Sequence, residues 1–168
     1  MKFLKLFVVA KKAGTVTRKY PFEEPLITEE FRGEIKIDPE KCIGCGACTL
    51  ICPPNALTMR DEGNVRLIRY FVGRCIFCGM CAEVCPTNAI AITKEFELAT
   101  LDTDDLLRDL LHKRVKCRIC GRPFLTTKLI KYANKDIPGS DNYADVCPEC
   151  RSKLSIKNIL KYRGDLDV

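Results

Sequence analysis

The sequence predicts an α+β protein whose central domain is a duplicated unit with pseudo-twofold symmetry. The first observation is an internal repeat, because residues 42–53 and 75–86 carry the same spacing of four cysteines followed by proline, at an offset of 33 residues. The second observation is the alternation of apolar and polar residues, which predicts short strands at 34–38, 57–60 and 65–70. The third is a turn signal between the last two strands, which makes them a hairpin.

The repeated cysteine motif predicts the metal ligands of the central domain. Its spacing is that of bacterial ferredoxins that bind two 4Fe-4S clusters. In that arrangement the first three cysteines of a repeat bind one cluster, and the fourth cysteine reaches the other cluster. The ligands expected for the first cluster are Cys42, Cys45, Cys48 and Cys85. Those expected for the second cluster are Cys75, Cys78, Cys81 and Cys52.

The residues between these cysteines suit a ferredoxin-like domain. Gly44, Gly46 and Gly79 let the backbone approach the sulfur atoms and donate N–H hydrogen bonds to them. Two linked clusters without another reactive set favour electron relay over an inert scaffold. The sequence shows no Ser/His/Asp or Cys/His set and no glycine-rich phosphate loop. We therefore expect no catalytic residue and no substrate pocket in this chain.

Residues 117–168 are expected to form a separate module with its own metal. Two Cys-x-x-Cys pairs separated by 26 residues predict a tetrahedral four-thiolate site. Its expected ligands are Cys117, Cys120, Cys147 and Cys150. Closed sites of this kind usually hold structural zinc, and Arg151 follows the second pair where a rubredoxin usually has glycine. We therefore expect one Zn2+ in a small zinc-ribbon-like module, with a single rubredoxin-like iron as the alternative.

Residues 1–33 are expected to form an amphipathic helix followed by an extended docking arm. Lys2, Lys5 and Lys12 fall on one helical stripe within 1–13, and large apolar residues cover most of the remaining surface. Two closely spaced prolines oppose regular structure in the arm. The alternative is a helix packed on its own domain. The terminal position and the two phenylalanines favour contact with a partner or a membrane interface.

The segments around the second metal site are expected to be largely helical. Residues 101–116 begin with a capping residue and carry leucines at helical spacing, which predicts a linker helix ending near His112. Within the C-terminal module, we expect a helix at 124–132, a polar loop at 134–145, and a short helix with a tail at 152–168. The expected domains are 1–33, 34–100, 101–116 and 117–168.

Composition restricts the alternatives. The twelve cysteines fall into three sets of four, and the first ten residues lack the features of a signal peptide. Metal binding in a reducing compartment is therefore expected, rather than disulfides. The net charge of +6 permits contacts with nucleic acid, lipid or acidic proteins, but basic residues between the last two cysteine pairs form only a thin patch. No apolar stretch approaches the roughly 20 residues needed to cross a bilayer, so no transmembrane span is expected.

The segment Arg74–Ile90 resembles the eight-iron ferredoxin-like subunit of respiratory complex I. Tyr20-Pro21 and Phe31-Arg32-Gly33 before the first cysteine, and Glu95–Ala99 after the second motif, are similar to the same family. The resemblance covers residues 1–115. The same subunit type occurs in membrane-bound NiFe hydrogenases and formate hydrogenlyases, where it can carry an extra Cys-x-x-Cys pair. The four-cysteine tail therefore indicates the hydrogenase-related branch.

This resemblance implies an electron-transfer subunit that relays single electrons through two 4Fe-4S clusters within a membrane-associated oxidoreductase complex. Its partners would be hydrogenase-like or complex I-like large and small subunits and a membrane arm, with ferredoxin as a candidate external donor. It would lie peripherally on the cytoplasmic face of the cell membrane. Two alternatives stay open at this point: a soluble ferredoxin-type electron shuttle, and a nucleic-acid-binding zinc ribbon fused to an iron-sulfur domain.

Overall fold

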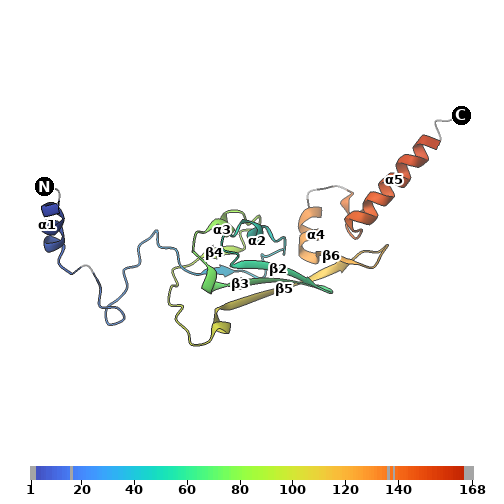
Figure 1. Cartoon of the computed structure of the whole chain (residues 1–168). Helices are drawn as coiled ribbons and strands as arrows, with labels where there is room; N and C mark the ends of the chain where they lie inside the picture. Colours follow the sequence, from blue (N-terminus) through green and yellow to red (C-terminus); the bar gives the residue numbers. More distant parts are fainter. Residues whose placement is uncertain (1–2, 16, 136, 138, 165–168) are drawn as a thin grey trace. The chain divides into compact units, whose positions relative to one another are not determined.

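The computed structural model describes residues 3–15, 17–135, 137 and 139–164 (Figure 1). The chain divides after Phe31 into two compact units, each of which is described by itself. Within the described residues, no helix combines the length and the apolar character needed to cross a membrane.

The first unit contains helix α1 (Phe3–Ala13) and an arm. Gly14, with φ of 62°, follows the helix, and its N–H donates to the carbonyl of Ala10 at 3.1 Å. The described part of the arm contains no helix or strand. The expected helix and irregular arm are therefore confirmed, except for residues 1–2 and 16, which lie outside the described residues. The apolar side chains of α1 are exposed within the unit, including Leu4, Leu6, Phe7, Val8 and Val9.

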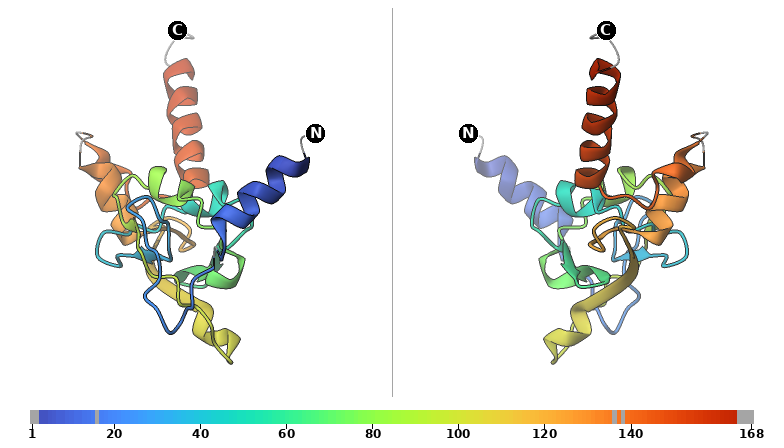
Figure 2. Two further views of the ribbon diagram at one scale, coloured as in Figure 1. Left: turned by 90° about the vertical axis from the view of Figure 1, so that its left-hand side faces the viewer. Right: turned by 90° about the vertical axis from the view of Figure 1, so that its right-hand side faces the viewer.

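The second unit is built on two antiparallel sheets. Strand β1 (Ile35–Ile37) pairs with β4 (Ile90–Ile92), so the residues before the first motif meet those after the second. Strands β2 (Leu57–Glu62) and β3 (Val65–Phe71) form the expected hairpin. Strand β5 (Leu107–Lys116) adds to β3, and β6 (Pro123–Thr126) adds to β5. Figure 2 shows the same elements from two opposite sides.

Two short helices complete the centre of this unit. Helix α2 (Ala47–Ile51) and helix α3 (Met80–Glu83) each lie within one cysteine motif, and they contact one another (Figure 1). A single turn of 3-10 helix, η1 (Val72–Arg74), leads from β3 into the second motif. The apolar core lies between these helices and the sheets. Its buried members are Ile35, Cys48, Ala56, Leu57, Ile68, Tyr70, Val72, Cys81 and Ile90.

The prediction of a linker helix at 101–116 is wrong. Only a short 3-10 turn, η2 (Thr103–Leu106), forms there, with Asp102 as its cap. The rest is β5, which pairs with β3 from Leu107 opposite Phe71 to Lys113 opposite Val65. Pairing with a neighbouring strand outweighs the helical spacing of the leucines, because it supplies hydrogen-bond partners to the unpaired backbone groups at the edge of β3. His112 is therefore not at a helix end; it is buried within a strand, with 5% of its surface exposed.

The C-terminal module differs in part from its prediction. The segment expected to be one helix at 124–132 is divided between β6 and helix α4 (Thr127–Asn134). Thr126 explains the division, because it ends the strand and its hydroxyl caps α4 by accepting from the N–H of Leu129 at 3.2 Å. The last helix, α5 (Pro148–Gly164), begins earlier than expected, inside the second cysteine pair. It is also longer than the short helix expected, because the expected tail residues Arg163 and Gly164 belong to it, and residues 165–168 lie outside the described residues.

Candidate metal centres

Two small cavities in the second unit are lined by cysteines from both motifs. Four thiols surround the first cavity; they belong to Cys42, Cys45, Cys48 and Cys85. Four thiols also surround the second; they belong to Cys52, Cys75, Cys78 and Cys81. Each cavity thus combines three cysteines of one motif with the last cysteine of the other. These are the two groupings expected from the motif spacing.

The two cavities also correspond in their other lining residues. All but one of the residues around the first cavity have a counterpart 33 positions away around the second. The pairs with identical residues outside the cysteines are Ile43 and Ile76, Gly46 and Gly79, Ile68 and Ile35, and Ala89 and Ala56. Each cavity therefore takes residues from both repeats. Ile35, which precedes the first motif, lines the second cavity, and Ile68, which precedes the second motif, lines the first.

The backbone repeats at the same offset. Gly46 and Gly79 have φ of 81° and 83°, and each starts the helix that follows it. Left-handed conformations of this kind favour glycine. Asn55 and Asn88 also match, with φ of 51° and 49°, and each donates its N–H to the backbone carbonyl of the last cysteine of its motif at 3.2 Å. The folding of each motif is therefore set locally by the same turn residues.

The buried thiols ionise only with a cation beside them. All twelve cysteines are free thiols. Burial, reinforced by the neighbouring thiols, raises the pKa of Cys48 to about 12 and that of Cys81 to about 11. Clustered thiolates in so small a volume are stable only when bound to metal, and iron-sulfur clusters supply that charge. Each donor set therefore fits a cluster.

Hydrogen bonds to sulfur support the same fit. The N–H of Ala89 donates to Cys85 Sγ at 3.2 Å, and the N–H of Phe77 donates to Cys75 Sγ at 3.4 Å. Burial alone would raise the pKa of Cys85, but the N–H groups of Ala89 and Thr87 and the Thr87 hydroxyl lower it below its ordinary value. The buried Tyr70 hydroxyl, beside the second cavity, has no hydrogen-bond partner among the described residues. A sulfur-rich group in that cavity would provide an acceptor.

The first cysteine loop is covered by residues that sequence reasoning missed. Thr126 donates its hydroxyl to the carbonyl of Ile43, and Arg66 donates to the carbonyl of Gly44 at 3.1 Å. Lys128 donates to the carbonyls just before the loop, at 2.7 and 3.1 Å. The His112 ring packs beside Gly44. Arg66 belongs to the hairpin, whereas the pairing of β5 and β6 onto it brings His112, Thr126 and Lys128 to the loop, and no local motif signals that pairing.

The residues that cover the first cysteine loop include an ion pair and a neutral imidazole. Asp61 binds the Arg66 guanidinium through both carboxylate oxygens, at 2.7 and 2.9 Å. The hydrogen bond from Arg66 lowers the pKa of Asp61, so the pair stays ionised. Burial lowers the pKa of His112, and the nearby Lys128 and Arg66 lower it further. The imidazole therefore packs as a neutral group against the loop.

Replacing Gly44 with alanine tests this close packing. Gly44 has φ of 71°, and a Cβ there would lie 2.8 Å from Thr126 Cγ2 and 3.0 Å from the His112 ring. Gly63 has φ of 52°, but a Cβ there would meet nothing within 4 Å. We expect Gly44→Ala to cost about 1–3 kcal/mol more than Gly63→Ala, because only the first also overpacks. This corresponds to roughly 2–4 °C per kcal/mol in the midpoint of thermal unfolding. Equal midpoints for both variants would contradict the packing described here.

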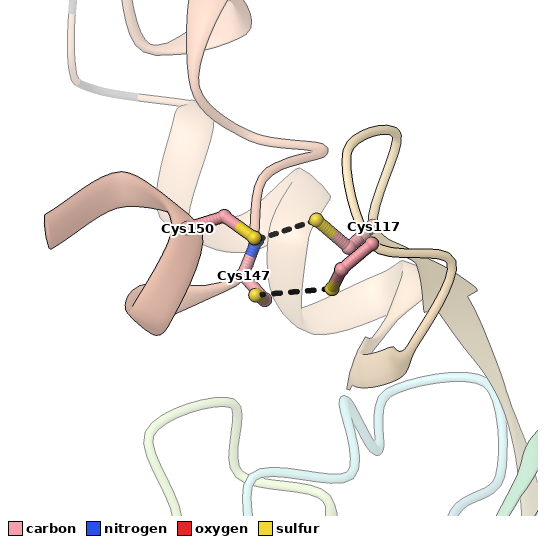
Figure 3. Close-up of side chains that lie close together, drawn as sticks. Cys117, Cys147 and Cys150 are labelled. Carbon is pink, nitrogen blue, oxygen red and sulfur yellow. Dashed lines mark hydrogen bonds between the residues drawn. The ribbon is translucent and has the colours of Figure 1, made fainter. Parts of the chain in front are cut away.

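The C-terminal module brings its four cysteines together. The sulfur atoms of Cys117, Cys120, Cys147 and Cys150 all lie within 4.8 Å of one another. Figure 3 shows Cys147 and Cys150, at the start of α5, facing Cys117 from the loop after β5. Three of the four are buried, and Cys120 is exposed. Val146, fully buried, and the partly buried Phe124 and Leu154 form the core around them.

The thiols of this module are prepared for metal binding. The N–H of Cys147 donates to Cys117 Sγ at 3.4 Å, and this bond is the main cause that lowers the pKa of Cys117 to about 6. The adjacent Cys147 thiol is the first cause that raises the pKa of Cys150 to about 12, as expected when several thiols crowd one site without a cation. The donor set fits a tetrahedral metal ion.

Comparison with known proteins found a family that matches the segment of the two cysteine motifs. The family described as "4Fe-4S dicluster domain" matches residues 41–89. Formate hydrogenlyase subunit 6 of Escherichia coli K12 is 43% identical over 150 residues, covering 83% of each chain. The chloroplast NAD(P)H-quinone oxidoreductase subunit I of Pelargonium hortorum is 47% identical over 98 residues, or 54% of this chain and 59% of that protein.

Among solved structures, a chain of the archaeal membrane-bound sulfane sulfur reductase matches with a TM-score of 0.44 and 23% identity, covering 81% of this chain and 69% of that chain. The sequence relationships are the stronger finding, because the match to the Escherichia coli protein extends over most of both chains. This chain belongs to the family of formate hydrogenlyase subunit 6.

Proposed function

We propose that this chain is an electron-transfer subunit that relays single electrons through two 4Fe-4S clusters within a membrane-associated, hydrogenase-related oxidoreductase complex. The observation that carries the proposal is the pair of cavities, each lined by three thiols of one motif and one of the other. The repeated backbone angles support a pseudo-twofold ferredoxin-like domain. Family membership supports a place in a complex of the hydrogenlyase type.

The protein's own residues hold and shield the clusters. The ligands of the first are Cys42, Cys45, Cys48 and Cys85, and those of the second are Cys75, Cys78, Cys81 and Cys52. When bound, each cluster supplies a site that accepts and releases one electron. Isoleucines from both halves line the cavities and exclude water, and backbone N–H groups donate to the ligand sulfurs. Burial and these hydrogen bonds together set the potential.

The four-cysteine module holds one structural Zn2+. Four sulfurs close the coordination sphere, which leaves no open position for catalysis. The metal organises a small core that includes Val146 and Phe124. A rubredoxin-like iron is the alternative occupant, and metal analysis separates the two.

The partners of this subunit are other subunits of the complex, namely hydrogenase-like or complex I-like large and small subunits and a membrane arm. The exposed apolar side chains of α1, such as Leu6 and Phe7, support a docking role for the first unit. The subunit lies peripherally on the cytoplasmic face of the membrane, and ferredoxin serves as the external donor.

Metal analysis of the purified chain and its complex tests the assignment. We expect about eight irons and one zinc per chain, from two cubanes and one four-thiolate site. Reduction should give two electron paramagnetic resonance (EPR) signals, one for each cluster. Nine irons without zinc would replace the zinc by a rubredoxin-like centre. Purification of the native protein as a stable monomer without other subunits would instead support a soluble electron shuttle.

A further inference from the structure

The two cavities differ in where they carry a hydroxyl group. At the 33-residue offset, Ile37 beside the first cavity corresponds to Tyr70 beside the second. Thr87 beside the first cavity corresponds to Pro54 beside the second. Each cavity therefore has one hydroxyl among its lining residues, supplied from different positions of the repeat. The two clusters would have different hydrogen-bond environments although their ligands are equivalent.

Tyr70 is placed to act on the second cavity. It lies on β3, with only 1% of its surface exposed, and its hydroxyl has no hydrogen-bond partner among the described residues. A buried hydroxyl without a partner costs free energy, so an acceptor is expected beside it. Burial raises the pKa of Tyr70, the neighbouring Cys75 side chain raises it further, and the N–H of Ile35 lowers it. A tyrosine hydroxyl carries its proton at neutral pH, so it can act as a donor.

We propose that the Tyr70 hydroxyl donates a hydrogen bond to sulfur at the Cys75 corner of the second cluster and raises the reduction potential of that cluster. This inference rests on the proposed function. Reduction adds negative charge to the cluster and its sulfurs, and a hydrogen-bond donor stabilises the more negative state. The paired position beside the first cavity holds Ile37, which cannot donate. Tyr70 thus acts on the reduction potential of the second cluster alone, without being one of its ligands.

Thr87 provides a matched control for this effect. Its hydroxyl oxygen lies 3.7 Å from the sulfur of Cys85, a ligand of the first cluster. Replacing Tyr70 with phenylalanine or Thr87 with valine removes a single hydroxyl while keeping nearly the same shape. The structure therefore predicts opposite selectivity for the two variants. Tyr70→Phe acts on the second cluster, and Thr87→Val acts on the first.

The test is an EPR-monitored redox titration of the complex carrying the wild-type chain, Tyr70→Phe or Thr87→Val. Cys78→Ala and Cys45→Ala identify the signals of the second and first clusters. We expect Tyr70→Phe to lower the potential of the second cluster and to leave the first unchanged. Electron-nuclear double resonance should also lose one exchangeable proton coupling from the second cluster, a change that a purely structural role would not produce.

The results of this titration distinguish an incorrect role for Tyr70 from an incorrect proposed function. Two clusters with unchanged potentials and an unchanged proton spectrum in Tyr70→Phe would overturn the role of Tyr70 and leave electron relay intact. An equal shift of both clusters would overturn it as well. A wild-type chain that contains no pair of clusters in its complex would overturn the proposed function itself. If Tyr70→Phe fails to assemble, the wild-type second cluster should show an exchangeable proton coupling beyond that of N–H donors such as Phe77, and absence of this further coupling refutes the proposal.

Discussion

Replacing Cys85 with alanine is expected to remove the same cluster as replacing Cys45, although the two residues belong to different motifs. Cys85 follows the second motif's other three cysteines in sequence, but it lines the cavity of the first motif. In the same way, Cys52 lines the cavity of the second motif. The physical reason is distance along the turn, because the fourth cysteine cannot reach the cluster that its three neighbours bind.

Four single variants test whether each motif supplies its fourth cysteine to the cluster of the other motif. Cys45→Ala and Cys85→Ala should lose the same EPR signal and keep the other, with iron falling from about eight toward about four per chain. Cys78→Ala and Cys52→Ala should lose the complementary signal. Ser155→Ala is a control, because this side chain lies on α5 and donates only to the carbonyl of Arg151 at 3.1 Å. If Cys85→Ala removes the signal that Cys78→Ala removes, the ligands are not exchanged between the motifs.

The features that the sequence predicts well are those specified by neighbouring residues. The cysteine spacing, the glycines at 46 and 79 and the hairpin turn at Gly63 act within one turn of chain. Each of these segments adopts the expected type of local structure. Comparison of the repeats could also have identified Tyr70, since the offset pairs it with Ile37 in the sequence alone.

The features that the sequence does not predict depend on distant segments. Leucines at 106, 107, 110 and 111 have helical spacing, yet β5 forms because β3 offers an unpaired edge about 40 residues earlier. Leu110 then packs against the core while Leu111 is exposed. The same pairing buries His112 and carries Thr126 to the first cysteine loop. No periodicity within 101–132 encodes these contacts.

The contacts between Thr126 and the first loop make the C-terminal metal important for the first cluster. Phe124 packs into the core around the four cysteines, and Thr126, two residues further along β6, donates to the carbonyl of Ile43. Thr126 is fully buried. A metal bound by the four cysteines would thus fix the strand that holds the loop between Cys42 and Cys45. Loss of that metal should loosen the loop while the second cluster, which β6 does not cover, keeps its support.

Cys147→Ala is therefore expected to lose the zinc and to make the first cluster more labile than the second. We expect iron from the first cluster to be removed by a chelator roughly ten-fold faster, as is typical when outer contacts of a metal site are lost. The measurement follows the decay of the two EPR signals during incubation with the chelator. Equal decay of both signals would show that the module does not support the first loop.

Thr126→Val separates the contact between Thr126 and the first cysteine loop from the metal itself. Valine keeps the shape of the side chain but removes the hydroxyl that donates to Ile43, at a cost of about 1–3 kcal/mol for the buried carbonyl left without this partner. This variant should retain zinc and still accelerate iron loss from the first cluster. Thr127→Val is its matched control, since the neighbouring hydroxyl donates to Lys113 at an exposed position away from the loop. Faster iron loss in Thr126→Val but not in Thr127→Val would assign the effect to the Thr126 hydroxyl, which donates to the carbonyl of Ile43 and also caps α4. Retention of normal cluster stability in Thr126→Val, with loss in Cys147→Ala, would place the support elsewhere in the module.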